Sequence, residues 1–435
     1  MLIDKIKSKH AKIGIIGLGY VGLPIAVAFA DKGFRVTGFD IVKEKVAQLK
    51  RGESYIGDVG GERLLPLSAA GRFQPTTDFS ALVAQDIIII AVPTPLNQTR
   101  DPDLTAVRAA TGQVAKYLQK GQLIILESTT YPGTTEEILQ PILEAGGLKL
   151  GEDFHLAFSP ERIDPGSNNS KGWNFGNTPK VVGGVTPKCL EPAVALYSQV
   201  VEKVVPVSSA RVAEMSKLFE NVFRVVNVAL VNEMSLLCNR MGLNVWEVLE
   251  AAGTKPYGFM KFTPGPGVGG HCIPVDPFYL TWKAREYEFN TRFIELAGEI
   301  NLQMPRYVRE LTIQALNRHR KSLNGSKVLL LGVAYKKDVA DLRESPAIKI
   351  IELLEQDGAE ISYCDPHLPG LQEGKHNLKA VELTPEALSG SDCVIIVTDH
   401  SAFDYELIVK YAPLIVDTRN ALAAVREGRE KIILL

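Results

Sequence analysis

The chain has 435 residues, 46% of them hydrophobic and 23% charged, with a formal net charge of −2. That length allows two or three ordinary soluble domains, and the nearly neutral charge gives no electrostatic case for binding nucleic acid or an anionic membrane. Five scattered cysteines without a Cys-x-x-Cys pair favour a reduced, cytoplasmic setting over a disulfide framework, and seven dispersed histidines without ligand spacing predict no structural metal.

Short apolar runs alternate with amphipathic stretches in the first part of the chain, whose N-terminus lacks the apolar region of a signal peptide. The runs predict buried strands at Lys12–Gly17, Arg35–Asp40, Asp86–Val92, Leu123–Glu127, Phe154–Ser159, Lys180–Gly183 and Lys203–Val207. The other stretches predict helices at Val21–Lys32, Lys43–Arg51 and Leu104–Gln119. This alternation favours an α/β domain with a parallel, doubly wound sheet over residues 1–207.

From Ser208 onward the pattern is helical. Helices are expected from about Ser208 to Met241, at Trp246–Ala252 and at Thr291–His319, and no run of about 18 apolar residues predicts a membrane span. After a turn at Asn324-Gly325 the sequence predicts strands at Lys327–Gly332, Glu360–Cys364, Cys393–Thr398 and Leu414–Asp417, with a helix at Ser345–Gln356. We therefore expect two doubly wound Rossmann-like domains, 1–207 and 324–435, joined by a helical middle domain, 208–323.

A Gly-x-Gly-x-x-Gly pattern, Gly17, Gly19 and Gly22, follows the first predicted strand and opens the first helix. Asp40 ends the next strand about 20 residues on, as a dinucleotide-binding fingerprint requires. The carboxylate would bind the ribose hydroxyls and repel a 2′-phosphate, which favours NAD over NADP. Basic neighbours such as Lys45 soften that preference. The alternative is that the glycines only close a strand–helix turn.

Cys272 stands in a run rich in glycine and proline, Gly265–Pro277, which indicates an irregular loop open to a ligand. A thiol that adds to an aldehyde beside a nicotinamide cofactor allows oxidation to continue to the acid level. Most free cysteines, however, are inert half-buried thiols. Asp276, four residues on, could act as a base or fix a lysine, and the adjacent His271 is a base or a substrate ligand.

Lys217 and Asn221 are four residues apart on a predicted helix, where both could stabilise a developing oxyanion. From spacing alone, a solvated helix face with i,i+3 pairs among Glu214, Lys217 and Glu220 is the stronger interpretation. Glu161 follows a predicted strand and could activate water, or it is an ordinary loop carboxylate.

Two further segments carry polar groups that could contact a ligand. Thr129, within Glu127–Thr130, offers a hydroxyl to the same crevice as Glu161. In the last domain Lys336, Lys337 and Arg343 suit a diphosphate, or form an exposed basic loop.

Together these motifs resemble the nucleotide-sugar 6-dehydrogenases, the UDP-glucose dehydrogenase superfamily. The resemblance spans nearly the whole chain and rests on the segments Gly17–Pro24, Val92–Pro95, Glu127–Thr129, Ser159–Glu161, Glu214–Asn221, Gly269–Cys272 and Arg343–Pro346. It implies an NAD-binding domain, a helical dimerising domain and a UDP-binding domain. It also implies a cytoplasmic oxidoreductase that uses two NAD to convert a sugar CH₂OH to a carboxylate, with a homodimer as the expected assembly.

The resemblance also implies roles for individual residues. Cys272 is the nucleophile that carries a thioester, Lys217 and Asn221 stabilise the oxygen, Asp276 supports Lys217 or a water, and Glu161 and Thr129 serve the hydrolytic water. Cofactor contacts are expected at Gly17, Gly19, Tyr20, Val21, Gly22, Asp40, Lys45, Pro93, Thr94 and Thr129. Substrate contacts are expected at Glu161, Arg162, Lys217, Asn221, Tyr257, Phe259, Gly269, His271, Lys336 and Arg343.

Two departures bear on the substrate. UDP-glucose enzymes usually carry a second Glu where this chain has Pro165, and Ser or Tyr where it has His271. Both departures resemble the branch that acts on UDP-N-acetylhexosamines. Within that branch, the segments Thr254–Phe259 and Pro277–Glu286 are more similar to UDP-GlcNAc 6-dehydrogenases than to UDP-ManNAc enzymes. We therefore expect UDP-GlcNAc as substrate in polysaccharide precursor synthesis. The alternatives are UDP-GalNAc, UDP-ManNAc or UDP-glucose, a single-step hydroxy-acid dehydrogenase, or a non-catalytic NAD-binding scaffold.

Overall fold

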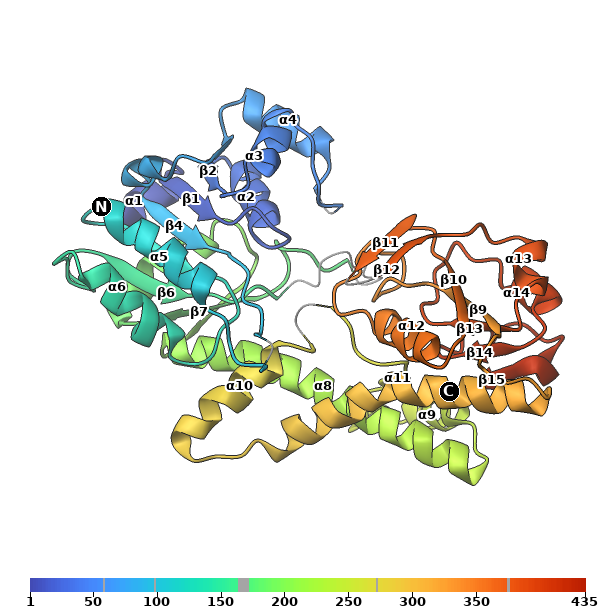
Figure 1. Cartoon of the computed structure of the whole chain (residues 1–435). Helices are drawn as coiled ribbons and strands as arrows, with labels where there is room; N and C mark the ends of the chain where they lie inside the picture. Colours follow the sequence, from blue (N-terminus) through green and yellow to red (C-terminus); the bar gives the residue numbers. More distant parts are fainter. Residues whose placement is uncertain (58, 98, 163–171, 271–272, 374–375) are drawn as a thin grey trace. The chain divides into compact units, whose positions relative to one another are not determined.

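The structure is a computed structural model that describes residues 1–57, 59–97, 99–162, 172–270, 273–373 and 376–435 (Figure 1). Two compact units make up the chain. The N-terminal unit comprises Met1–Glu220 and Phe278–Phe289, and the C-terminal unit comprises Asn221–Pro277 and Asn290–Leu435. Each unit contains its own β-sheet and is described by itself.

Within the described residues, the sheet of the N-terminal unit has eight strands in the order β3-β2-β1-β4-β5-β6-β7-β8. The strands are β1 (Lys12–Ile16), β2 (Arg35–Phe39), β3 (Phe73–Thr76), β4 (Ile87–Ile90), β5 (Leu123–Leu126), β6 (His155–Phe158), β7 (Lys180–Gly184) and β8 (Val204–Val207). The first six run parallel, but β7 pairs antiparallel with β6, at Ala157 opposite Gly184 and Phe158 opposite Gly183. The expectation of a wholly parallel sheet is therefore wrong for its last two strands.

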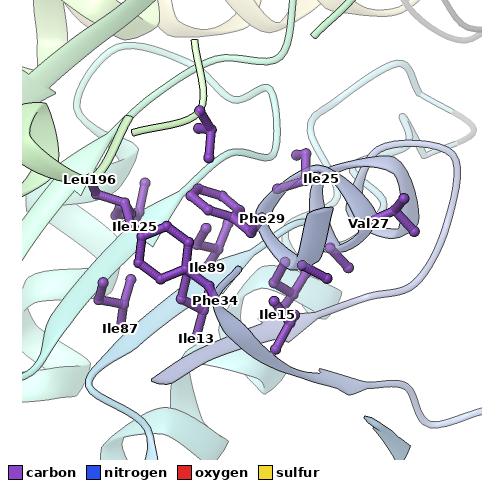
Figure 2. Close-up of a cluster of buried hydrophobic side chains, with 14 of the residues drawn as sticks. Ile13, Ile15, Ile25, Val27, Phe29, Phe34, Ile87, Ile89, Ile125 and Leu196 are labelled. Atoms are coloured by element: carbon purple, nitrogen blue, oxygen red, sulfur yellow. The ribbon is translucent and has the colours of Figure 1, made fainter. Parts of the chain in front are cut away.

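Helices cover this sheet and bury its apolar runs. They are α1 (Leu2–Lys7), α2 (Gly22–Asp31), α3 (Lys43–Lys50), α4 (Gly61–Ala69), α5 (Thr105–Tyr117), α6 (Gln140–Glu144) and α7 (Pro187–Tyr197), with a 3₁₀ turn at Phe79–Ala84 and a π-helical turn at Thr135–Leu139. All four isoleucines of β4 are fully buried, as expected of a parallel strand covered on both faces. Figure 2 shows side chains of β1, β4 and β5 packed with Phe29 of α2 and Leu196 of α7.

Four long or medium helices follow: α8 (Ala210–Met241), α9 (Val245–Gly253), α10 (Asp276–Ala284) and α11 (Arg292–Arg318). The boundary between the two units falls inside α8, between Glu220 and Asn221. By length and composition alone α8 could also cross a membrane, a test that core helices of soluble proteins pass as well. The sequence reads as an irregular loop up to Pro277, but α10 already begins at Asp276, where a proline in the first turn is compatible with a helix.

The C-terminal unit carries a parallel sheet of five strands among the described residues, in the order β10-β9-β13-β14-β15. The strands are β9 (Lys327–Leu331), β10 (Glu360–Cys364), β13 (Cys393–Ile396), β14 (Ile415–Asp417) and β15 (Ile432–Leu434), with helices α12 (Pro346–Gln356), α13 (Pro385–Ser389) and α14 (Tyr405–Tyr411). The expected second α/β domain is present. Between β10 and β13 the chain forms an antiparallel pair of strands, β11 (Gly370–Glu373) and β12 (His376–Lys379), which the sequence pattern does not predict.

Candidate functional site

The three glycines of the turn after β1 have different surroundings: Gly17 and Gly22 are closely packed, whereas Gly19 has open space around it. Gly17 has a φ of +93°, and a Cβ there would lie 2.4 Å from the carbonyl oxygen of Ala91. A Cβ on Gly22, the first residue of α2, would lie 1.8 Å from the Gly17 carbonyl oxygen. Around Gly19 no atom lies within 4 Å of an added Cβ among the described residues. The turn therefore leaves room at Gly19 for a diphosphate to approach the backbone.

Asp40 holds this turn from the end of β2. One carboxylate oxygen accepts the Leu18 N–H at 3.0 Å, and the other accepts the Val42 N–H at 2.9 Å. Only 8% of the residue is exposed. Each carboxylate oxygen can accept more than one hydrogen bond, so Asp40 retains capacity for ribose hydroxyls.

Tyr55 and Lys45 complete the surroundings of the turn. The Tyr55 hydroxyl donates to the Leu18 carbonyl at 2.6 Å, and Lys45 Nζ lies 5.4 Å from the centre of the Tyr55 ring. Lys45 thus lies against a side chain that contacts the turn. Burial, with the charge of Asp40 adding to it, raises the pKa of Tyr55 far above its ordinary value.

The loops after β4 and β5 are tied together at the carboxyl edge of the same sheet. Ser128 Oγ accepts the Val92 N–H at 2.9 Å and lies 2.8 Å from the Val92 carbonyl oxygen, to which it can donate. The expected cofactor contacts on these loops differ in exposure, because Pro93 is exposed, Thr94 is buried and Thr129 is half-buried. On the glycine-rich turn Tyr20 is exposed and Val21 is half-buried. The described residues of this edge therefore fit a dinucleotide.

A cluster of four polar side chains lies close to this edge: Glu127 after β5, Glu161 after β6, Lys180 at the start of β7 and Tyr197 of α7. Lys180 Nζ lies 2.7 Å from a carboxylate oxygen of Glu127 and 3.3 Å from one of Glu161. The Tyr197 hydroxyl donates to the other oxygen of Glu127. The exposed fractions of the side chains are 0% for Glu127, 4% for Lys180 and 13% for Glu161. We call these four residues the Lys180 cluster.

The charges in the Lys180 cluster depend on each other. Burial raises the pKa of Glu127, and the ammonium group of Lys180 offsets part of that effect. Burial acts to lower the pKa of Lys180, but the two neighbouring carboxylates outweigh it and raise the pKa. Lys180 is therefore a protonated, desolvated cation between two acidic side chains. Sequence reasoning places Lys180 only as the start of a strand and does not identify it as a site residue.

Arg162, expected to contact substrate, is engaged within the N-terminal unit. Its guanidinium lies 2.7 Å from Glu220 and donates to the Pro179 carbonyl at 2.7 Å. Its backbone N–H donates to the Glu161 carboxylate at 2.7 Å. Arg162 thus braces the segment that follows β6 and orients the Glu161 side chain.

Glu214 and Lys217 lie on the buried face of the first half of α8, so the interpretation of these residues as a solvated face with i,i+3 pairs is wrong. Glu214 is 0% exposed and Lys217 is 8% exposed. The Glu214 carboxylate accepts the N–H of Gly133, the N–H of Thr135 at 2.9 Å and the Thr135 hydroxyl at 2.6 Å. Burial nevertheless raises the pKa of Glu214 to about 7 against these three donors. Hydrophobic spacing alone does not reveal which polar residues of a long helix face inward.

In the C-terminal unit the structure brings Asn221 and Asp276 together. Asn221 Nδ2 donates to the Asp276 carboxylate at 2.6 Å, and the two residues are only 3% and 1% exposed. A carboxylate that accepts one N–H of the amide in this way fixes the orientation of Asn221, whose NH₂ group carries a second N–H that can donate to another acceptor. Asp276 thus acts on Asn221, a pairing that the sequence does not suggest.

The glycine run before Cys272 packs on the C-terminal sheet domain. The Gly270 N–H donates to the Arg343 carbonyl at 2.9 Å, and a Cβ on Gly269 would lie 2.6 Å from the Tyr335 Cβ. The Arg343 guanidinium pairs with Asp341 at 2.6 Å. Cys272 and His271 themselves lie outside the described residues.

Three expected substrate contacts remain to be placed in the same unit. Tyr257 and Phe259 are exposed, at 73% and 41%, and Lys336 is half-buried. The exposed aromatic pair is available for a ligand or another chain. The burial of Lys336 argues against a fully solvated basic loop.

Asp338, His367 and His400 meet in the C-terminal unit with potential metal-binding atoms within 4.8 Å of one another. The histidines are dispersed in the sequence, so this gathering is not visible in their spacing. His400 Nδ1 accepts the Asp338 N–H at 2.9 Å, and its Nε2 lies 3.1 Å from Asp365. Both ring nitrogens of His400 therefore have protein partners, and the group serves to join the loops after β9, β10 and β13.

Three consecutive family profiles match the chain. Residues 11–201 match the NAD binding domain of the UDP-glucose/GDP-mannose dehydrogenase family, residues 211–303 its central domain and residues 329–424 its UDP binding domain. These matches show that the cofactor of the chain is NAD.

Several relatives are similar over almost their full length. The UDP-N-acetyl-D-glucosamine 6-dehydrogenase of Pseudomonas aeruginosa is 36% identical over 91% of this chain and 92% of that protein. The NDP-N-acetyl-D-galactosaminuronic acid dehydrogenase of Ralstonia nicotianae is 36% identical over 95% and 97%. The solved structure of UDP-D-ManNAc dehydrogenase from Pyrococcus horikoshii has a TM-score of 0.87 at 34% identity and covers 97% of this chain and 98% of that one. Relatives named for three different hexosamines thus resemble the chain to a similar degree.

Proposed function

Because the chain belongs to the UDP-glucose/GDP-mannose dehydrogenase family, we propose that it carries out the NAD-dependent four-electron oxidation of UDP-GlcNAc at C6, giving UDP-N-acetylglucosaminuronate. The observation that carries the proposal is the common edge of the N-terminal sheet. The glycine-rich turn after β1 and the acidic residues after β5 and β6 all follow the carboxyl ends of parallel strands. One sheet edge thus offers both a cofactor loop and a carboxylate able to take a proton from water.

The cofactor contributes one kind of chemistry, since bound NAD accepts a hydride from a substrate carbon. The protein must hold the sugar and move protons. In the first oxidation, the C6 alcohol loses a proton and a hydride to become an aldehyde. We assign Lys217, buried in α8, and Asn221, held by Asp276, to the reacting oxygen, where a cation and an amide donor stabilise negative charge.

We assign Cys272 as the nucleophile because it is a thiol within the glycine- and proline-rich run Gly265–Pro277 of a chain that uses NAD. Its thiolate adds to the aldehyde carbon, and transfer of the second hydride to a second NAD leaves a thioester. Water then attacks the thioester carbonyl while Glu161 takes a proton from that water. The C–S bond breaks to release the thiolate and the carboxylic acid, which loses its own proton to solvent. Thr129, half-buried after β5, is proposed to help position the water.

The choice of UDP-GlcNAc rests on the sequence departures at Pro165 and His271 and on the segments Thr254–Phe259 and Pro277–Glu286. The Pseudomonas relative carries the same substrate in its name. Lys336 and Arg343, in the part of the chain that matches the UDP binding domain, are proposed to hold the diphosphate. We also propose that the NAD-binding domain ends at residue 207 and that the UDP-binding domain begins after residue 323.

We further propose a cytoplasmic homodimer. Met215, Phe219 and Phe223 of α8 are 40%, 63% and 43% exposed and recur every four residues, which places them on one helix face. An apolar stripe of this kind is typical of a protein interface. Light scattering on the purified chain tests it, with a monomer at micromolar concentration as the contradicting result.

The decisive experiment counts NADH formed per molecule consumed with UDP-GlcNAc, UDP-GalNAc, UDP-ManNAc and UDP-glucose. Two NADH per sugar, with the highest kcat/KM for UDP-GlcNAc, supports the proposal. A higher value for another UDP-sugar changes the substrate and keeps the reaction. One NADH favours a single-step dehydrogenase, and NAD binding without turnover of any UDP-sugar favours a non-catalytic scaffold.

A further inference from the structure

We propose that Lys180 is a positioning residue for thioester hydrolysis: anchored on Glu127, it holds the Glu161 carboxylate toward the water that Glu161 activates. This inference rests on the proposed function, because it assigns Lys180 to the last step of that reaction.

The anchoring starts from the deeper of the two carboxylates. Glu127 is completely buried and binds both Lys180 and the Tyr197 hydroxyl. Lys180 Nζ also lies 5.2 Å and 5.3 Å from the ring centres of Phe175 and Tyr197. A lysine side chain has many rotamers in water, but here two aromatic rings and a buried carboxylate restrict it. Lys180 is therefore a fixed point from which a second carboxylate can be oriented.

That second carboxylate is Glu161, the more exposed of the pair. One of its oxygens lies 3.3 Å from Lys180 Nζ, and the other accepts the N–H of Arg162 at 2.7 Å. These two donors, one on each oxygen, set the plane of the carboxylate. A carboxylate oxygen can accept more than one hydrogen bond, so this arrangement is compatible with Glu161 taking a proton from water. Lys180 thus lies behind the base and sets its direction.

The antiparallel direction of β7 is what delivers Lys180 to this position. Glu127 and Glu161 follow the carboxyl ends of β5 and β6, whereas Lys180 is the first residue of β7. Because β7 runs against β6, its first residue lies at the edge where the parallel strands end. In a parallel β7 the same residue would start at the opposite edge, one five-residue strand or about 16 Å away.

The expected consequence is selective for hydrolysis. Both hydride transfers precede the attack of water, so a displaced Glu161 leaves them intact and lets the acyl-enzyme accumulate. A catalytic group displaced by about 1 Å loses on the order of 100-fold in rate. We expect Lys180→Met to slow release of the acid between about 10- and 100-fold.

The test is a stopped-flow measurement of NADH formation with UDP-GlcNAc, followed by intact-protein mass spectrometry of the quenched enzyme. Lys180→Met should give a rapid burst of two NADH per active site, a slow steady state and a mass increase that matches the sugar acyl group. Glu161→Gln should behave alike, and the double variant should lose no more than either single one. The control is Lys203→Met, which removes an exposed lysine just before β8 and should behave as wild type.

Lys180→Met leaves two carboxylates without their cation, which can impair folding. The variant Glu127→Gln/Lys180→Met removes the buried pair together and should show the same burst and adduct. The role of Lys180 is wrong, and the proposed function stands, if wild type forms two NADH per sugar but the variants slow all phases equally or accumulate no acyl-enzyme. Wild type that forms fewer than two NADH per sugar overturns the proposed function and this inference with it.

Discussion

Replacing Glu214 with Gln should change how the stability of the protein depends on pH. Glu214 is fully buried in α8, and its pKa is raised to about 7 from an ordinary value of 4.5. The folded state therefore holds a proton on this carboxyl that the unfolded chain has already released between pH 4.5 and 7. The stabilisation linked to that proton is complete below pH 4.5 and is lost as the pH rises through 7.

The size of the effect follows from the difference between the two pKa values. A shift from 4.5 to about 7 corresponds to about 3 kcal/mol, most of which is lost between pH 5 and 8. Glutamine has nearly the shape of a protonated glutamate and does not titrate. The free energy of unfolding of wild type, measured relative to Glu214→Gln, should therefore fall by about 2 to 3 kcal/mol over this range.

The measurement is urea unfolding followed by circular dichroism at pH 5, 6, 7 and 8, with Glu233→Gln as a control for an exposed carboxylate of the same helix. Titration of other groups cancels in the difference between variant and wild type. Hydrogen bonding opposes the effect of burial on the pKa of Glu214, because two N–H groups and one hydroxyl donate to its carboxylate and favour the ionised form. Wild type that gains stability relative to Glu214→Gln as the pH rises would show that these donors outweigh burial.

Three further predictions concern the cofactor and the chemistry. Gly22→Ala places a Cβ 1.8 Å from the Gly17 carbonyl oxygen and should lower both the melting temperature and the affinity for NAD. Gly19→Ala places a Cβ with no described atom within 4 Å, so it should weaken NAD binding at least 10-fold without loss of stability. Calorimetry measures both the melting temperature and the affinity. Asp40→Ala should narrow the preference for NAD over NADP, measured as the ratio of kcat/KM values; an unchanged ratio contradicts its ribose role. Cys272→Ser should abolish steady formation of two NADH per sugar, and wild-type turnover by this variant would exclude a covalent step.

The pattern of apolar runs predicts most of the sheet strands correctly to within one or two residues. It does so because parallel strands covered on both faces are continuously hydrophobic, as at Ile87–Ile90 and Leu123–Leu126. The glycine-rich turn is equally visible, since its geometry permits no side chain at Gly17 or Gly22. Local rules suffice where the constraint itself is local.

The rest depends on contacts between segments that are distant in sequence. The burial of Glu214 is set by the N–H groups of a loop some eighty residues earlier, so helical spacing suggests a solvated position. The pairing of Asn221 with Asp276 joins residues 55 apart. The start of α10 is obscured by Pro277, which marks a loop in a sequence pattern and a first helical turn in the structure.

The reversed direction of β7 also affects how this chain can vary. Because β6 ends and β7 begins at one edge, the link between Glu161 and Lys180 does not have to cross a face of the sheet. Residues can be inserted into or deleted from an edge link of this kind without shifting the register of either strand. It is therefore a natural position for grafting the corresponding segment of a relative while the ion pair between Lys180 and Glu161 stays in place.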